Sequence, residues 1–222
     1  MQSVEDVEAF AGISGEPRSL LEPFNYDGVR LRSGMFKSQC DATWDYFFKL
    51  SNDEMLKGFR ERAGMPAPGK SLGGWYGGDP APDKDYPQRW PDFLFSRGDM
   101  FNTFGQWLSG MARMSRATGD QAMSEKAAVM MREWAKTIEP DGFFYYSRNP
   151  IAPHYTYEKM VGGLVDLFEF GGVKDAIPHL ERITDWAIKN LDRKRVNPSP
   201  ENPASVGGCE WYTLCENLYR AY

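Results

Sequence analysis

Residues 104–120, FGQWLSGMARMSRATGD, and residues 152–172, APHYTYEKMVGGLVDLFEFGG, decide the fold. In each stretch the apolar residues recur every three or four positions until a glycine interrupts them, which is the pattern of an amphipathic helix with a stop signal. A second periodic stretch follows each of them and carries a Trp-Ala pair near its end. The pattern therefore predicts two antiparallel helical hairpins within residues 99–191.

The two hairpins are copies of one repeat. A shift of 52 residues places Gly119 on Gly171 and Trp134 on Trp186. A hairpin period of this size is typical of stacked or circular helical arrays. The same shift places Phe170 on Tyr222, so the next turn glycine would be residue 223, and we expect the array to continue in a longer protein.

The part before the repeat divides into a lead-in and a first helical stretch. Residues 1–40 mix Pro, Gly and short apolar runs, and we expect them to be irregular. An apolar pattern starts after the cap candidate Asp41, is interrupted at residues 51–53, and stops at Gly64. The breaker-rich residues 66–91 predict a long loop. We therefore interpret residues 41–222 as one helical domain.

Composition excludes several classes of partner. The formal net charge is −5 and no basic run occurs, so nothing indicates nucleic-acid binding. No stretch reaches eighteen apolar residues, and the start of the chain lacks a signal-peptide pattern, so no membrane span is expected and the compartment stays open. Cys209 and Cys215 lack the spacing of a zinc dyad, so we expect no metal site in this chain.

Four segments together resemble, in order and spacing, the N-terminal portion of glycoside hydrolase family 127, the β-L-arabinofuranosidases. They are residues 66–79 (PAPGKSLGGWYGGD), the two stretches quoted above, and residues 211–222 (WYTLCENLYRAY). The resemblance implies an all-α, (α/α)6 six-hairpin barrel, of which this chain would be the N-terminal part.

Departures from the family pattern fall at the family's sugar-contacting histidines. Where the family commonly reads GHxxGHYLSA, this chain has Asn102 and Gln106, and where the family reads YTLHK, it has YTYEK with Glu158. The family's proposed cysteine nucleophile and its zinc site of one Glu and three Cys would lie beyond residue 222. The resemblance thus implies a substrate-facing scaffold in this chain, with the catalytic residues left unassigned.

Candidate sugar contacts gather where the chain enters the inner helix of each hairpin. The shift places Gln106 on Glu158 and Glu158 on Glu210. These polar groups could instead interact with exposed backbone N–H groups at the helix starts. Trp75 could stack on a sugar face or simply cover the rim of the barrel. The candidate substrate-binding residues are Trp75, Asn102, Gln106, Tyr155, Glu158, Glu210 and Trp211.

Three functions remain open from the sequence. The first is a glycoside hydrolase that removes terminal arabinofuranose-type sugars from plant-type glycans, for which Glu158 and Glu210 could supply a carboxyl pair. The second is another helical-barrel sugar enzyme, such as an unsaturated-uronide hydrolase or an epimerase. The third is a noncatalytic sugar-binding or scaffold module. All three predict a carbohydrate partner, and we expect these 222 residues alone to be inactive.

Overall fold

The computed structural model describes residues 30–70, 72, 104–146, 148, 150, 153–191 and 214–221. The described residues contain helices and connecting turns but no strand, which confirms the predicted all-α class. The helices are α2 (Met35–Lys49), α3 (Asn52–Arg62), α5 (Phe104–Thr118), α6 (Gln121–Ala135), α7 (Pro153–Glu169), α8 (Ala176–Asn190) and α9 (Leu214–Ala221).

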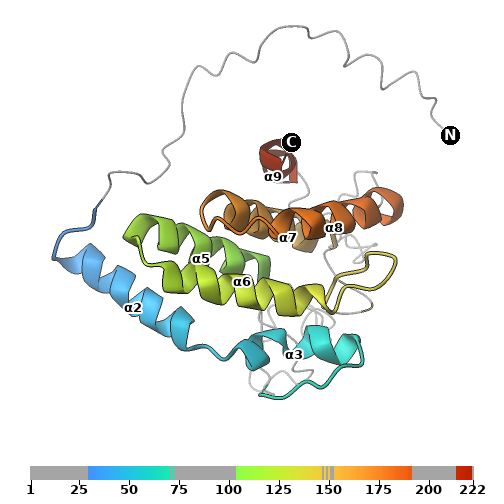
Figure 1. The fold of residues 1–222 in the computed structure, drawn as a ribbon, viewed down its shortest axis with the longest axis horizontal. Coiled ribbons are helices and arrows are strands. Elements are labelled where there is room, and N and C mark those ends of the chain that lie inside the picture. Colours follow the sequence, from blue (N-terminus) through green and yellow to red (C-terminus); the bar gives the residue numbers. More distant parts are fainter. Residues whose placement is uncertain are drawn as a thin grey trace, which may run out of the picture.

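The contacts between the helices define two layers. Figure 1 shows α9 at the top, followed downward by the pair α7 and α8, the pair α5 and α6, and then α2 and α3. In one layer α7 packs between α5 and α9, and it packs most extensively against α5. In the other layer α6 packs on α5, and α8 packs on α7. Helices α2 and α3 lie against α6 on the side away from α9. This layering of inner and outer helices is the arrangement expected for hairpins in a helical barrel.

Both predicted hairpins are present. Helix α5 ends at Gly119, whose φ of 76° is in the left-handed region and whose N–H donates to the carbonyl of Ser115. In the second hairpin the stop lies at the Gly171-Gly172 pair, and the left-handed residue is Gly172, with φ 69°. The amide of Gly171 donates to the carbonyl of Asp166, five residues back, so the helical turn widens at the end of α7 before the chain reverses.

The first helix of the described residues begins earlier than the sequence predicts. Helix α2 starts at Met35, so the last residues of the expected lead-in 1–40 are helical. Gly34 precedes it with φ 148° and ψ −174°, a conformation open essentially to glycine alone, and its carbonyl accepts from the Ser38 amide. The predicted interruption at residues 51–53 is confirmed, because α2 ends at Lys49 and α3 starts at Asn52.

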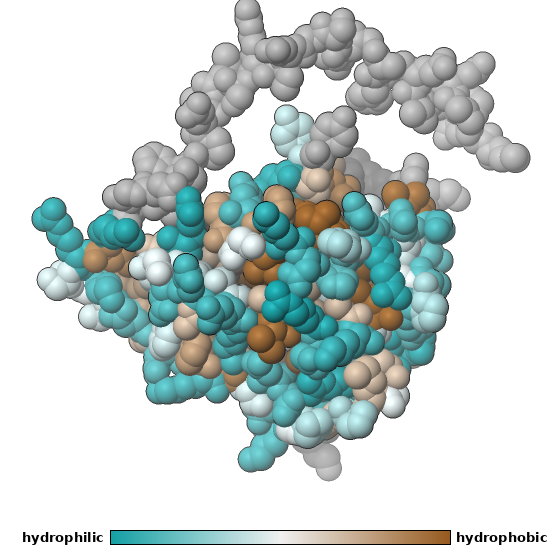
Figure 2. Space-filling model, viewed as in Figure 1, coloured by the Kyte–Doolittle hydropathy of each residue, from teal (hydrophilic) through white to brown (hydrophobic). Residues whose placement is uncertain are grey.

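The core lies between the two layers and is rich in aromatic residues. The helical spacing of the aromatic residues predicts that Trp107, Trp134, Phe168 and Trp186 pack in the core, and the three tryptophans are buried as predicted. Phe168, which was expected to pack in the same way, is exposed in the last turn of α7. The face of the molecule seen in Figure 2 is mostly hydrophilic, with hydrophobic residues in small groups. Among the described helices, none combines the length and the apolar character that crossing a membrane requires.

Candidate functional site

The site is positioned by an unusually close approach of α5 and α7. A Cβ atom added to Gly105 would lie 2.1 Å from the carbonyl oxygen of Lys159, and one added to Gly163 would lie 2.4 Å from the carbonyl oxygen of Gly105. Both neighbours are backbone atoms, so only glycine fits at these positions. The contact joins the first turn of α5 to the middle of α7, which runs parallel to it, and Gln106 and Tyr155 lie at the N-terminal ends of the two helices.

Four side chains gather at these ends, and we call them the entrance cluster: Gln106 of α5 with Tyr155, Glu158 and Lys159 of α7. The Gln106 Nε2 donates to the Tyr155 hydroxyl at 3.5 Å. The Lys159 Nζ lies 4.7 Å from the centre of the Tyr155 ring and 2.7 Å from the Glu158 Oε2. Hence three of the predicted site residues are linked, with Lys159 joining Tyr155 to Glu158.

Gln106 and Glu158 do not face each other, although the repeat shift sets them at equivalent positions. Successive residues of a helix point about 100° apart, so when Lys159 turns its backbone to α5, Glu158 points to a neighbouring face of α7. There its Oε1 accepts a hydrogen bond of 2.5 Å from the Asn217 Nδ2 of α9. Glu158 is 4% exposed. It is therefore a buried carboxylate between α7 and α9.

The other oxygen of Glu158 is incompletely satisfied. Its Oε2 is buried and has no hydrogen-bond partner among the described residues, although the Lys159 Nζ is near. The contact between Lys159 and Glu158 is therefore an ion pair, and its donor and acceptor angles do not meet the geometry of a hydrogen bond. A buried oxygen with spare acceptor capacity is uncommon in folded proteins and marks a place where a donor can add.

A residue in the connection before α7 holds the first turn of this helix through a hydrogen bond. The buried Tyr145 donates from its hydroxyl to the carbonyl of Pro153, the first residue of α7, at 2.9 Å. Burial, with a smaller contribution from nearby Tyr157, raises the pKa of Tyr145 well above its ordinary value, so the phenol stays a donor. This bond fixes the turn of α7 that carries Tyr155.

A second polar group lies farther along α7, around the buried carboxylate of Asp166. It accepts from the Ser109 Oγ and the Arg113 Nε of α5, both at 2.6 Å, and from Arg220 of α9. Burial lowers the pKa of Arg220, but its hydrogen bonds to Asp166 and Glu169 outweigh this and raise it above its ordinary value. Asp166 thus ties all three helices of one layer together.

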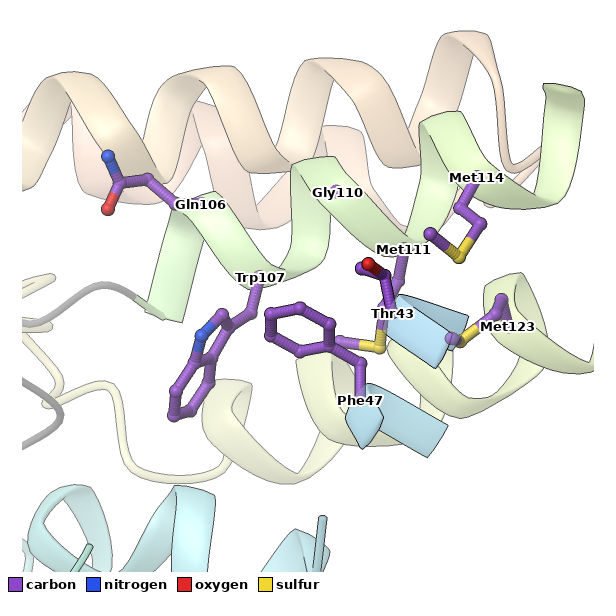
Figure 3. Close-up of a pocket in the computed structure, with 8 residues that line it drawn as sticks. All are labelled: Thr43, Phe47, Gln106, Trp107, Gly110, Met111, Met114 and Met123. Carbon is purple, nitrogen blue, oxygen red and sulfur yellow. The ribbon is translucent and has the colours of Figure 1, made fainter. Parts of the chain in front are cut away.

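A cleft between α2, α5 and α6 does not suit a sugar. Its volume is about 80 Å³, whereas an apolar cavity of about 150 Å³ is known to hold a benzene ring. In Figure 3 the Gln106 side chain points away from the other lining residues, which are mostly apolar. The lining residues are Thr43, Phe47, Gln106, Trp107, Gly110, Met111, Met114 and Met123.

Four of the predicted contacts lie outside the described residues: Trp75, Asn102, Glu210 and Trp211. Their roles stay predictions. Among the residues that the structure does describe, no three His, Cys, Asp or Glu side chains are grouped as a metal site. Cys40 of α2 is half-buried and Cys215 of α9 is exposed, and both are free thiols. The described residues therefore do not fit a zinc ion.

Comparison with known families gives a match over residues 28–222 to the model described as beta-L-arabinofuranosidase, GH127 catalytic domain. No curated protein and no solved structure matches the chain. The match spans most of the sequence and agrees with the observed all-α hairpins. The chain therefore belongs to the GH127 family of glycoside hydrolase catalytic domains.

Proposed function

We propose that the entrance cluster binds the sugar of a glycoside hydrolase that removes terminal arabinofuranose-type residues from plant-type glycans. Sugar hydroxyls need both donors and acceptors. Glu158 is an acceptor, Lys159 is a donor, and Gln106 and Tyr155 can be either. The observation that supports the proposal best is the buried Glu158 Oε2, which has no hydrogen bond among the described residues and could accept one from a sugar hydroxyl.

In this proposal the residues of the chain bind and orient the sugar. The close contact of α5 and α7 fixes the spacing of Gln106 and Tyr155, and the ion pair of Lys159 with Glu158 supplies opposite charges side by side. Fixed donors and acceptors hold a substrate in one orientation, which is how positioning groups lower a reaction barrier. The nucleophile and zinc implied beyond residue 222 stay predictions, and no reaction step is derived through them.

Replacing Glu158 by Gln tests the proposal. Glu158→Gln keeps the shape of the side chain and removes its charge, so binding of methyl β-L-arabinofuranoside should weaken by about 1 to 3 kcal/mol. Titration calorimetry on the protein measures this change. The matched control is Glu125→Gln on the exposed side of α6, which should bind as the wild type does. Equal affinity in Glu158→Gln and wild type would remove Glu158 from the sugar site.

A further inference from the structure

A residue of another helix, α9, positions the Glu158 carboxylate. Its Oε1 accepts from the Asn217 Nδ2 of α9 at 2.5 Å, and among the described residues no other hydrogen bond to its carboxylate is found. Without a bond from outside its helix, the carboxylate could rotate about its last torsion, whose energy profile is broad. The bond to Asn217 removes that freedom and leaves Oε2 beside Lys159.

The orientation of Asn217 is itself determined. The Arg220 Nη1 donates to the Asn217 Oδ1 at 3.2 Å. A guanidinium can only donate, so the amide oxygen must face Arg220 and the NH2 group must face Glu158. Arg220 in turn is bonded to the buried Asp166 and, at 2.7 Å, to Glu169. A chain of fixed donors and acceptors therefore runs from Asp166 to Glu158.

Glycine at position 162 makes room for this arrangement. A Cβ atom added to Gly162 would lie 2.8 Å from the Asn217 Nδ2, closer than such contacts allow. Gly162 lies inside α7, where glycine costs about 1 kcal/mol relative to alanine, so a packing reason for it is expected. The Asn217 amide packs against Gly162, where α7 has no side chain, and from there donates to Glu158.

We propose that Asn217 is a positioning residue for Glu158, and that Asn217 itself packs against Gly162 and is oriented by Arg220. Asn217 acts through Glu158 by occupying Oε1, so that Oε2 is the oxygen presented to the sugar. This inference rests on the proposed function only where it says that Glu158 contacts a sugar. The hydrogen bond from Asn217 to Glu158 and the packing of Asn217 against Gly162 can be tested without any sugar.

Two substitutions disturb the positioning without touching Glu158. Asn217→Ala removes the donor, and Gly162→Ala adds a methyl group that pushes the amide away while favouring the helix. A charged hydrogen bond of ordinary strength corresponds to about tenfold in affinity, so both variants should bind methyl β-L-arabinofuranoside about tenfold more weakly. Glu216→Ala, an exposed change on the same helix, should bind as the wild type does.

Amide hydrogen exchange of α9 separates positioning from a structural role. The Arg220 bonds to Asp166 and Glu169 remain in both variants, so protection of α9 should be unchanged while affinity falls. Wild-type affinity in both variants, or loss of affinity only together with loss of α9 protection, would overturn the proposal.

The Asn217 side-chain amide signal in NMR gives the sugar-independent test. It should move when Glu158 is replaced by Gln and should move in Gly162→Ala, because both changes alter its hydrogen bond. If the wild type binds no arabinofuranoside, the proposed function fails while the positioning is still decided by this signal. A signal that stays in place in both variants overturns the positioning.

Discussion

Gly105→Ala should lower the free energy of unfolding by about 3 kcal/mol or more, the upper range for overpacked sites. The added Cβ would meet the carbonyl oxygen of Lys159 at 2.1 Å and the amide nitrogen of Met160 at 2.6 Å. Backbone atoms inside a helix cannot turn away as a side chain can, so α5 and α7 must separate. Urea unfolding followed by circular dichroism measures the loss. Binding at the entrance cluster should weaken as well, because Gln106 moves with α5.

The matched control is on the same helix. A Cβ at Gly110 would meet nothing within 4 Å, and the position is exposed. Gly110→Ala should therefore stabilise the protein by roughly 0.5 to 1 kcal/mol through helix propensity and a more restricted unfolded chain. If Gly105→Ala and Gly110→Ala have the same stability, the close contact of α5 and α7 is wrong.

Asp166→Ala should be the second severe change, with a loss of about 3 kcal/mol. The carboxylate is 1% exposed and accepts from Ser109, Arg113 and Arg220, so its removal leaves two guanidinium groups without their shared partner. The side chains of Arg113 and Arg220 are 38% and 22% exposed, so water will compensate part of the loss. Helix α9 should lose protection in hydrogen exchange, since Arg220 is one of two α9 residues whose polar bonds to α7 fall within the described part of the chain.

Glu169→Gln provides the comparison, because Glu169 pairs with the same Arg220 from an exposed position. Exposed ion pairs contribute about 0 to 1 kcal/mol, so this variant should stay within that range of the wild type. A large loss in Glu169→Gln together with a small loss in Asp166→Ala would mean that α9 is held from the surface and not from the buried carboxylate.

Apolar periodicity and turn glycines were enough to predict the hairpins. They predicted α5 to α8, since a 3.6-residue pattern with a glycine stop has few other interpretations. They did not predict the start of α2, because the signal there is the backbone conformation of Gly34 and not a capping side chain. The sequence also did not tell which residue of the Gly171-Gly172 pair is left-handed, because either glycine can adopt that conformation.

The site was less accessible to prediction, because its contacts depend on how helices meet. The sequence led to Gln106 and Glu158 but not to Lys159, although Lys159 follows Glu158 directly in the quoted motif. The glycines at 105, 162 and 163 carried a readable signal, since glycine within a helical pattern often marks a close approach. Nothing in the sequence linked Asn217 to Glu158, because that pairing exists only once α9 lies on α7.

The most direct measurement is a map of the chemical shifts that methyl β-L-arabinofuranoside changes in the protein. We expect the sugar to shift the side-chain amide of Gln106, the ring of Tyr155 and the backbone amides of Glu158 and Lys159, with little change around the apolar cleft at Met111. Shifts confined to that cleft, or none at the N-terminal ends of α5 and α7 at sugar concentrations that saturate binding, would contradict it.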